Sequence, residues 1–389
     1  MRIGVDMTTW ANWRGYGRFT RSLIGALLEI DRANDYVLFF DAPSYGTIPP
    51  PRGGRHVVVR TKTEQGPSAS GRRRLYDLAR MTAAVHREPL DVFFFPSVYS
   101  FFPLLGRPRT LVVVHDTIAE AHPELIFPGR RARLFWDLKV RLALFQADRV
   151  VTVSEHARRD VHRHFGLAEE RIAIIPEAPA GIFRPPTSRA AARVCAQRRH
   201  GLSTPYLLYV GGFGPHKNVA GLVDAFADLI EEPRSSDLVL LLVGKRRGDE
   251  FYSTADDLEG HIRRRSLETR VRFLDFQPDE SLVLLYQGAE ALVLPSVREG
   301  FGLPGIEAAA CGTPVVATRR SALPDVLGDA AIYVDPEHPP SLLGALRSVL
   351  GDPETRRRMD RARERIHELS WQRSAERAIE IFTEMRPKG

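Results

Sequence analysis

The sequence predicts an α/β protein built around parallel sheets. Thirteen short apolar runs alternate with helix-length amphipathic stretches along the 389 residues, an order typical of parallel strands joined by crossover helices. The runs are continuously apolar rather than alternating with polar residues, which indicates strands that are buried on both faces. At roughly 150 residues per domain, the length predicts two domains or more.

The apolar runs fall into two successive sets. The predicted strands of the first half lie at 2–6, 36–40, 56–59, 91–95, 110–116, 149–154 and 171–176. Those of the second half lie at 206–212, 238–244, 271–275, 291–296, 313–318 and 331–335. Two sets with intervening helices predict two Rossmann-like domains.

The segment between the two sets is rich in Pro, Ala and Arg. It predicts a linker at 181–204 between a domain at 1–180 and a domain at 205–365, although 189–201 has the composition of a helix. The tail predicts a final helix within 366–389, because its apolar residues share one helical face. These residues are Trp371, Ala375, Ala378, Ile379 and Phe382.

The composition excludes several classes of protein. Hydrophobic residues make up 43% and charged residues 26%, values typical of a globular chain rather than a disordered or fibrous one. No apolar run approaches the ~18 residues of a membrane span, and the start MRIGVDMTTW lacks the features of a signal peptide. Cys195 and Cys311 are too few for a disulfide framework or a cysteine metal site. We therefore expect a cytosolic protein.

The charge balance favours anionic partners. Lys and Arg number 55 against 48 Asp and Glu, and the pI is about 9.6, which suits nucleotides, phosphorylated substrates, anionic lipids or nucleic acid. The runs Arg72–Arg74 and Arg263–Arg265 are interpreted as solvated helix faces, because no aromatic stacking pattern accompanies them. In the stretch 129–145 the predicted core stripe is Leu134, Leu138, Leu142 and Phe145. The alternative is that this helix, together with Arg72–Arg74, approaches an anionic leaflet to reach a lipid-linked acceptor.

The most informative motif lies between Pro295 and Thr318. Glu299 and Glu307 flank the turn Gly300-Phe301-Gly302-Leu303-Pro304. Pro304 suits the first turn of a helix, so the amides of Gly302 and Leu303 would lie at a helix N-terminus, which attracts anions. Carboxylates beside an anion site fit the hydroxyls of a sugar or ribose. The alternative is a solvated glutamate and a glutamate favoured by the helix dipole.

A second glycine turn, YVGGFGPHKN, follows the strand that begins at 206. Gly211 and Gly212 let the backbone approach a ligand closely, and Lys217 supplies a point charge for phosphate. The turn lacks the GxGxxG spacing, and no acidic residue ends the next strand, which weakens a dehydrogenase interpretation. Sugar, phosphate and ribose groups at strand ends together predict a nucleotide-sugar site.

The whole pattern resembles the retaining glycosyltransferases of family 4, whose architecture of two Rossmann domains is called GT-B. The resemblance rests on the glutamate pair E-GFGLPGI-E, continued by ACGTPVVAT, and extends over nearly the whole chain. Further segments that match are WRGYGRFTRSL, VVHDTIAEAHPE, RVVTVSEHARRD, VRFLDFQPDESLVLLYQGAEALVLPS and SALPDVLGDAAIYVDP.

This resemblance implies a nucleotide-sugar donor in the C-terminal domain, an acceptor in the N-terminal domain, and a final helix that crosses back to the N-terminal domain. It assigns Glu307 to the ribose, Glu299 to the donor sugar, and Lys217 to the diphosphate. The turn Gly300 to Leu303 would bind the sugar or diphosphate. Many relatives carry an arginine where this chain has Gly212, so His216 and Arg298 are further candidates for neutralising the diphosphate.

Two further groups come from the N-terminal half. His115 ends a predicted strand, and the resemblance implies that it contacts the donor sugar near the reacting carbon, whereas the alternative is a buried structural histidine. Asp116 would cap the next helix or orient the imidazole. The loop Gly15-Tyr16-Gly17-Arg18 would line the acceptor side of the diphosphate. Ser154 is predicted to be the N-cap of a helix that begins at Glu155.

No Asp-x-Asp triplet occurs in the chain, which favours a metal-independent enzyme without a cofactor. The first expected donor is GDP-mannose, followed by UDP-glucose and UDP-N-acetylglucosamine, and the acceptor is a glycan, a lipid-linked saccharide or a small molecule. The alternatives are a sugar-nucleotide epimerase, a sucrose-type synthase or a non-catalytic nucleotide binder. We expect no nucleic-acid partner and at most peripheral, salt-sensitive contact with the inner face of the plasma membrane.

Overall fold

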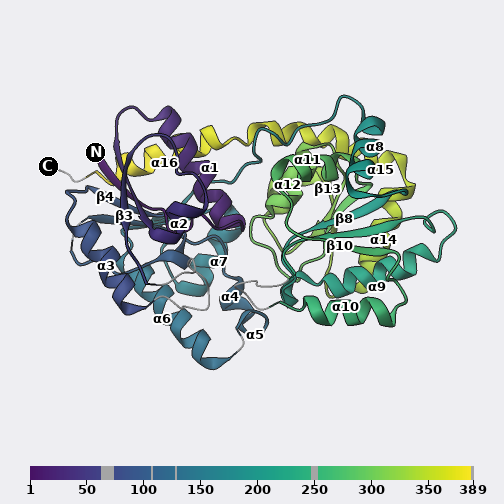
Figure 1. Cartoon of the computed structure of the whole chain (residues 1–389), viewed down its shortest axis with the longest axis horizontal. Coiled ribbons are helices and arrows are strands. Elements are labelled where there is room, and N and C mark those ends of the chain that lie inside the picture. The colour runs from purple at the N-terminus through teal and green to yellow at the C-terminus, as the bar shows by residue number, and fades with distance from the viewer. Residues whose placement is uncertain (63–73, 107, 128, 247–252, 387–389) are drawn as a thin grey trace. The chain divides into compact units, whose positions relative to one another are not determined.

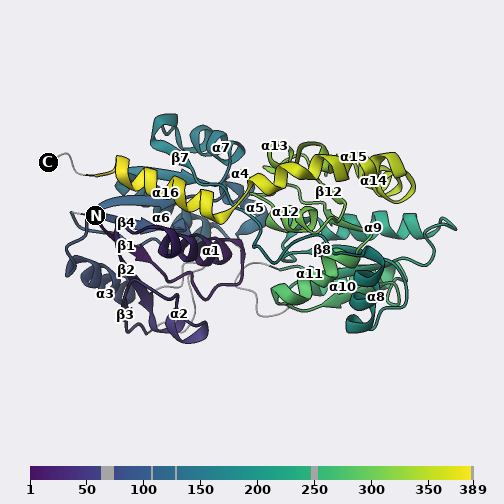
Figure 2. The same cartoon turned by 90° about the horizontal axis from the view of Figure 1, so that it is seen from above.

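The computed structural model describes residues 1–62, 74–106, 108–127, 129–246 and 253–386. The chain forms two compact units (Figures 1 and 2). Unit 1 comprises Met1–Pro123, Phe127–Glu177 and Ser370–Gly389, and unit 2 comprises Glu124–Ile126 and Ala178–Leu369. The thirteen strands expected from the apolar runs are all present.

Unit 1 is built around a seven-stranded sheet in the order β3-β2-β1-β4-β5-β6-β7, with every neighbouring pair parallel. Its strands bury continuous runs such as VFFF because helices cover both faces. The strands are β1 (Arg2–Asp6), β2 (Asp35–Asp41), β3 (Arg55–Val59), β4 (Val92–Phe95), β5 (Arg109–Val113), β6 (Arg149–Thr152) and β7 (Ile172–Ile174).

The helices of unit 1 include one from the far end of the sequence. Helix α16 packs along α1, and both views show them side by side, whereas α3 and α6 lie on the opposite side of the unit (Figures 1 and 2). The helices are α1 (Gly15–Ile30), α2 (Ala42–Thr47), α3 (Leu75–His86), α4 (Ile118–Ala121), α5 (Pro123–Ile126, mostly in unit 2), α6 (Arg130–Gln146), α7 (Glu155–Phe165) and α16 (Trp371–Glu384), with 3₁₀ turns η1 (Val98–Ser100) and η2 (Glu169–Arg171).

Unit 2 contains a six-stranded parallel sheet in the order β10-β9-β8-β11-β12-β13. Its core lies between this sheet and the surrounding helices, where Phe213, Leu222 and Phe226 are fully or almost fully buried. The strands are β8 (Tyr206–Val210), β9 (Val239–Val243), β10 (Val271–Leu274), β11 (Ala291–Leu294), β12 (Val315–Thr318) and β13 (Ala331–Val334).

The remaining helices complete unit 2. They are α8 (Arg189–His200), α9 (Val219–Ile230), α10 (Ala255–Arg264), α11 (Asp279–Gly288), α12 (Leu303–Ala310), α13 (Leu323–Leu327), α14 (Pro339–Gly351) and α15 (Pro353–Ala362), with 3₁₀ turns η3 (Pro215–Lys217), η4 (Gly328–Ala330) and η5 (Arg363–Glu368).

Each sheet has a point where the direction of strand addition reverses. In unit 1 the reversal lies between the paired strands β1 and β4, and in unit 2 between the paired strands β8 and β11. Ligands of open α/β sheets bind outside the carboxyl ends of the strands at such a point. The segments that follow β1, β4, β8 and β11 therefore deserve the closest inspection.

Three expectations about local structure differ from what the structure shows. The helix that the composition of 189–201 allowed is present as α8, which Ser188 caps and which packs against α11. The residues Gly15 to Arg18 form the first turn of α1 rather than a loop, since the Arg18 amide donates to the Arg14 carbonyl at 2.9 Å. In α16, Ile379 is only half-buried, whereas Ile381, which was not expected on the buried face, is fully buried.

The third difference concerns α6. Leu134, Leu138 and Phe145 were expected in the core and are instead exposed, and Leu142 is half-buried. A second apolar stripe on the same helix faces the core in their place, because Trp136, Val140, Ala143 and Leu144 are buried.

Two further expectations concern the start of α7 and the basic run at 72–74. Ser154 is the N-cap of α7, as predicted, and its hydroxyl accepts from the Ala157 amide at 3.0 Å. Of the basic run at 72–74, Arg72 and Arg73 lie outside the described residues.

Candidate active site

The two glycine-containing segments of unit 2 are joined by hydrogen bonds at the carboxyl ends of β8 and β11. The Val297 amide donates to the His216 carbonyl at 2.8 Å, and the Asn218 side chain donates to the Pro295 carbonyl at 3.2 Å. Segments that are about 80 residues apart in sequence therefore form one structural site, at the position where parallel sheets bind ligands.

The turn after β8 is shaped by close backbone packing. The Gly211 amide donates to the Val243 carbonyl at 3.0 Å, and the Tyr209 hydroxyl donates to the Gly212 carbonyl. A Cβ atom on Gly244 would lie 2.0 Å from the Gly211 carbonyl oxygen, so the end of β9 leaves no room for a side chain. These contacts hold the turn that leads into η3 and Lys217.

Lys217 and Glu299 form a partly buried ion pair. The Lys217 Nζ lies 2.7 Å from one carboxylate oxygen of Glu299 and 2.9 Å from the other, and the Ser296 hydroxyl donates to this carboxylate at 2.8 Å. Burial alone raises the pKa of Glu299, but the Lys217 ammonium and these hydrogen bonds outweigh it and lower the net pKa below the ordinary value. Glu299 is therefore held as a carboxylate.

Helix α12 begins next to this ion pair in sequence. Its N-cap is Gly302 with φ of +83°, and a Cβ atom there would lie 2.9 Å from the Leu323 side chain, so glycine suits both the conformation and the space. Pro304 lies in the first turn, as the sequence predicted, and no side chain caps the helix. Pro304 has no N–H, and the Gly305 amide donates to the Gly302 carbonyl at 2.8 Å. The Leu303 amide is therefore the first-turn donor at the positive end of the helix that no side chain caps.

Glu307 occupies the buried side of α12. It is almost inaccessible to solvent, and its Oε2 accepts from the Tyr286 hydroxyl at 3.1 Å. Four residues later, burial, followed by the charge of Glu307, raises the pKa of Cys311 to about 12. That thiol is therefore a packing group and not a nucleophile at neutral pH.

The remaining residues of the turn line this region unevenly. Phe301 and Leu303 are buried, whereas Arg298, Glu299 and Gly300 are half-buried. The structure therefore brings together the predicted cation, carboxylate and helix start, and it adds Ser296 and Tyr286, which the sequence analysis missed. Ser296 follows a strand end, a placement that could have flagged it, whereas nothing in the sequence marked Tyr286.

In unit 1 the imidazole of His115 is held on both nitrogens. Its Nε2 lies 2.9 Å from the Pro96 carbonyl oxygen, which only accepts, so Nε2 carries a proton. Its Nδ1 lies 3.4 Å from the Glu177 carboxylate, and the edge of the ring meets Phe19 with centroids 4.9 Å apart. Pro96 follows β4 and Glu177 follows β7, so strand ends of one sheet fix the ring.

Glu177 was not predicted from the sequence, although its place directly after an apolar run is a usable signal. Burial raises its pKa above the ordinary value, and the hydrogen bond and charge of His115 counteract this only in part. A carboxyl group with a raised pKa next to an oriented histidine is typical of functional sites. Asp116 precedes Thr117, the N-cap of α4, and its Oδ1 accepts from the Ile118 amide at 3.0 Å.

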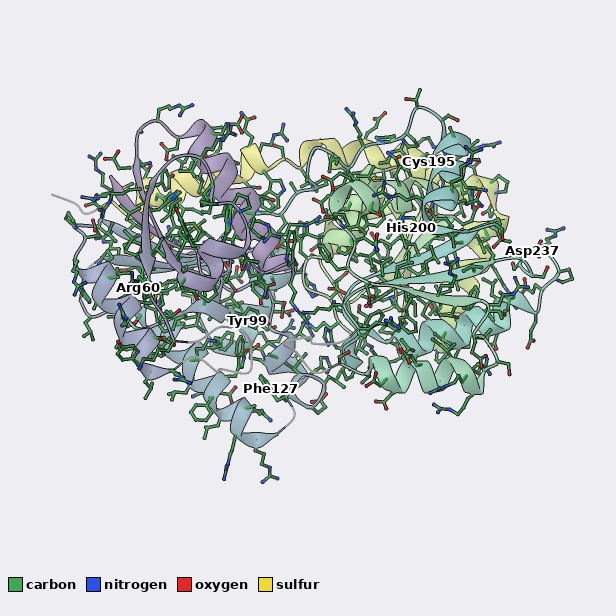
Figure 3. The ribbon with its side chains drawn as sticks, in the orientation of Figure 1. Arg60, Tyr99, Phe127, Cys195, His200 and Asp237 are labelled. Atoms are coloured by element: carbon green, nitrogen blue, oxygen red, sulfur yellow. The ribbon has the colours of Figure 1, made fainter. Side chains whose placement is uncertain are left out.

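The first turn of α1 is tightly packed against the segment before it. A Cβ atom on Gly17 would lie 1.9 Å from the Asn12 carbonyl oxygen, so only glycine fits there. Tyr16 stacks on Tyr99, which is labelled in Figure 3, with ring centroids 5.0 Å apart. No side chain caps α1 either, so its start is a second uncapped helix N-terminus.

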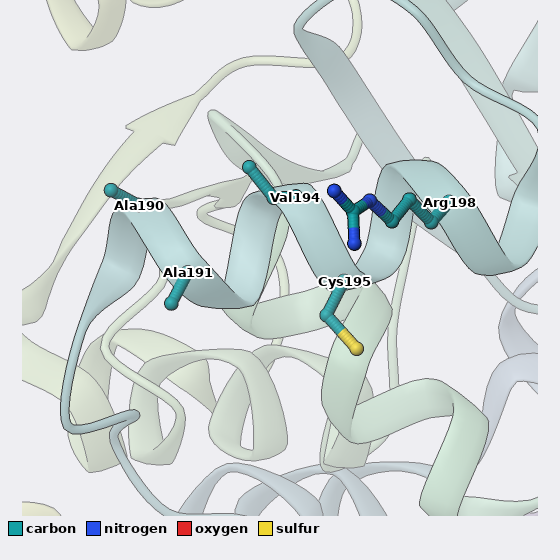
Figure 4. Close-up of a pocket in the computed structure, with 5 residues that line it drawn as sticks. All are labelled: Ala190, Ala191, Val194, Cys195 and Arg198. Atoms are coloured by element: carbon teal, nitrogen blue, oxygen red, sulfur yellow. The ribbon is translucent and has the colours of Figure 1, made fainter.

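Other features of the described residues do not add to the site. A shallow hollow on α8 is lined by Ala190, Ala191, Val194, Cys195 and Arg198 and includes none of the predicted site residues (Figure 4). Within the described ranges, no group of three or more His, Cys, Asp or Glu residues is placed to hold a metal ion. Among the same residues, no helix is long and apolar enough to cross a membrane.

Comparison with known proteins gives concordant matches for both units. Residues 196–365 match the model of the family described as Glycosyl transferases group 1, and residues 13–178 match that described as Glycosyltransferase Family 4. Over 388 residues, 95% of each chain, the sequence is 28% identical to O-antigen chain mannosyltransferase B of Escherichia coli.

Two solved structures show the same fold. Sucrose-phosphate synthase from Thermosynechococcus elongatus superposes with a TM-score of 0.80 at 21% identity, covering 99% of both chains. Alr3699/HepE of Anabaena, solved in complex with UDP and glucose, superposes with a TM-score of 0.74 at 16% identity, covering 99% of this chain and 100% of that one.

Proposed function

Because the chain belongs to the group 1 and family 4 glycosyltransferases and has their GT-B fold, we propose that it is a retaining, metal-independent hexosyltransferase. The donor is a nucleotide sugar, with GDP-mannose as the first candidate, because the similar Escherichia coli protein is named as a mannosyltransferase. The acceptor is a glycan, a lipid-linked saccharide or a small molecule.

The observation that carries this proposal is the Lys217–Glu299 pair at the start of α12. A cation, a fixed carboxylate and uncapped helix amides gather at the carboxyl ends of β8 and β11. The cation and the helix start suit a diphosphate, and the carboxylate suits sugar hydroxyls. A nucleotide sugar is the ligand that carries both groups next to each other.

In the proposed reaction the acceptor oxygen bonds to the anomeric carbon as the bond between that carbon and the diphosphate oxygen breaks. The acceptor proton passes to the departing diphosphate on the same face of the sugar, so the configuration is retained. Lys217 stabilises the negative charge that develops on the diphosphate, with the amides of Gly302 and Leu303 as further donors. Glu299 orients the hexose, and Glu307 binds the ribose.

Unit 1 would supply the acceptor side of the reaction. His115 would contact the donor sugar near the reacting carbon, and the residues Gly15 to Arg18 would lie along the diphosphate. The imidazole is already held by Pro96 and Glu177, so its orientation needs little rearrangement when substrate binds.

The decisive experiment is a donor panel. Purified protein is incubated with GDP-mannose, UDP-glucose and UDP-N-acetylglucosamine, and nucleotide release is measured together with thermal stability. A true donor at 100 times its Kd adds about 2.7 kcal/mol to the free energy of unfolding. If neither GDP nor UDP ligands raise the melting temperature, the nucleotide assignment is wrong. EDTA is expected to leave the rate unchanged.

UDP-glucose is the second candidate donor, because the similar Anabaena protein was solved with UDP and glucose. The same panel separates the two, since the preferred nucleotide stabilises the protein at lower concentration. Proton NMR of the first product decides the stereochemistry, because a product with the opposite anomeric configuration to the donor would rule out retention.

A further inference from the structure

Helix α6 is apolar on two opposite faces. On one face Trp136, Val140, Ala143 and Leu144 are buried against unit 1. On the other, four large apolar side chains are 64–85% exposed, and we call them the α6 outer face: Leu134, Phe135, Leu138 and Phe145. Large apolar side chains gathered on one exposed face indicate an interaction surface, and these four remain exposed in unit 1.

The buried face is firmly fixed, so the outer face cannot simply rotate inward. The Trp136 indole donates to the Glu120 carboxylate at 2.7 Å, and its ring lies 4.9 Å from Tyr99 and 6.2 Å from Phe127. Tyr99 and Phe127 are labelled in Figure 3. At its other end, the Gln146 side chain bonds to both backbone groups of Leu104.

Three of the four residues share one side of the helix. At about 100° per residue, Leu134, Leu138 and Phe145 project within roughly 40° of one another. Phe135 projects about 60° to one side of Leu138, and the exposed Arg141 lies between Leu138 and Phe145 on the same side. Leu105 is also exposed. It lies close to the end of α6, because the preceding residue, Leu104, accepts a hydrogen bond from the side chain of Gln146, the neighbour of Phe145 in sequence. The apolar surface therefore continues past the end of α6 into the loop between η1 and β5, where the Leu105 amide donates to His86 of α3.

Basic residues flank the stripe. Arg130, Arg131, Arg133 and Arg141 are exposed, and the only acidic residue of the helix, Asp137, lies 3.8 Å from Arg133. With Lys139, the helix contains five basic residues against one acidic residue. Long apolar side chains between arginines match a bilayer surface, where the apolar groups enter the acyl region and the guanidinium groups reach the phosphates.

Unit 2 offers no comparable surface among its described residues. Its large exposed apolar side chains are Ile182, Val194 and Phe276, which lie on three separate segments. Scattered single apolar residues are normal on a protein surface, whereas a contiguous stripe indicates an interaction site.

We propose that the α6 outer face docks the protein onto an anionic lipid bilayer. The occupant is a membrane rather than a second copy of the chain, because a two-fold contact through this helix would bring its arginines against themselves. The docking combines an electrostatic attraction with insertion of Leu134, Phe135, Leu138 and Phe145. This docking therefore differs from the salt-sensitive membrane contact that was expected from the charge balance, because part of it should persist at high salt. The docking does not depend on which nucleotide sugar is the donor.

The test is flotation of the full-length protein with lipid vesicles, without substrate. One set contains phosphatidylcholine alone and the other contains phosphatidylglycerol as well, each at ~0.1 M and ~1 M salt. Three variants are compared with the parent: L134S/L138S/F145S, the charge variant R130E/R131E/R141E, and the matched control F276S from unit 2. Because all these residues are exposed, unchanged melting temperatures verify that the variants are folded.

The parent is expected to bind the anionic vesicles and to keep part of that binding at ~1 M salt. The triple serine variant should partition roughly 100-fold more weakly, the charge variant should lose binding at low salt, and F276S should behave like the parent. Equal binding of the parent and the serine variant, or no binding of the parent at low salt, would overturn the proposal. So would a parent dimer that the serine variant converts to monomer, because a second copy would then be the occupant.

Discussion

At the scale of single residues, the sequence predicted side chains but not their pairing. Lys217 and Glu299 were each singled out because they lie near glycine turns at strand ends. Their direct ion pair follows from the pairing of β8 with β11, a non-local contact that no local pattern encodes. Glu177 was missed because a single acid after a strand carries no motif, and its role emerges only from its distance to His115.

The first prediction concerns Lys217. In Lys217→Ala the loss of a charge-assisted contact worth roughly 1.5–3 kcal/mol in the transition state should lower kcat about 10- to 150-fold. Steady-state kinetics with the preferred donor measure this. Arg347→Ala is the control, because it removes a cation from an exposed ion pair of unit 2, here with Glu232, and it should leave the rate unchanged.

Substitutions of Glu299 and Glu307 should weaken the binding of different ligands. Glu307→Ala is expected to weaken binding of the free nucleoside diphosphate, and Glu299→Ala to weaken the intact nucleotide sugar more than the nucleotide alone. Calorimetric titration of both ligands distinguishes the two effects. A variant without both carboxylates that still transfers at the parental rate would refute the site.

The second prediction concerns Glu177 and pH. Burial, only partly offset by His115, raises the pKa of Glu177 above 4.5, so the folded protein holds this proton to higher pH than the unfolded chain. The free energy of unfolding should therefore fall as the pH rises from about 4.5 through the raised pKa. Glu177→Gln removes this titration, and its melting temperature should decline less between pH 5 and pH 8 than that of the parent.

The same variant also tests the positioning of His115. The amide keeps the size of the carboxyl group but not its charge, so kcat should fall and its pH profile should shift while KM for the donor changes little. A variant with the parental pH profile and the parental stability curve would show that Glu177 only fills space.

At the scale of elements, strands were easier to predict than helix faces. The thirteen strands were predicted from continuously apolar runs. Because such a strand is apolar on both faces, the prediction does not depend on selecting which face is buried. Helix α6 contains two apolar stripes with the same period, one with Leu134 and one with Trp136, so periodicity alone could not select the buried one. The stripe with Trp136 is the buried one, because its ring packs against Tyr99 and its indole N–H donates to Glu120.

The third prediction uses two glycines in the first turn of α1. Gly17→Ala would place a methyl group 1.9 Å from a backbone oxygen, so it should cost about 1–3 kcal/mol or more of stability. Gly15→Ala has open space around its Cβ position and should be neutral or stabilise by about 0.4–1 kcal/mol. Urea unfolding measures both. Equal destabilisation by the two substitutions would contradict the close packing at Gly17.

At the scale of the whole molecule, the composition and length correctly indicated two α/β units, but the path of the chain between them depends on its last helix. Phe382 on α16 is fully buried and meets Phe94 of β4 edge-on, with centroids 5.7 Å apart. Ser374 donates to the Pro176 carbonyl at 2.7 Å. The pattern of Trp371, Ala375, Ala378 and Phe382 predicted an amphipathic helix. That this helix packs on the N-terminal domain was implied only by the resemblance to the glycosyltransferase family.

The fourth prediction follows from this packing. Phe382→Ala should cost about 3–5 kcal/mol of the stability of unit 1, and Phe145→Ala, on an exposed surface, should cost under ~0.5 kcal/mol. Hydrogen exchange should accelerate in β1 and β4 and stay unchanged in β8 and β11. Equal acceleration in both sheets would show that the two units unfold as one.

The return of α16 to unit 1 also has a consequence for synthesis on the ribosome. Unit 2 is an insertion within unit 1, since 178–369 separates the last strand of unit 1 from its final helix. Domains that are contiguous in sequence can fold in the order of their translation, and unit 2 meets this condition as soon as its residues emerge. The first unit to be translated is therefore the last to be completed, and until α16 emerges the nascent chain leaves Phe94 and the outer side of α1 uncovered.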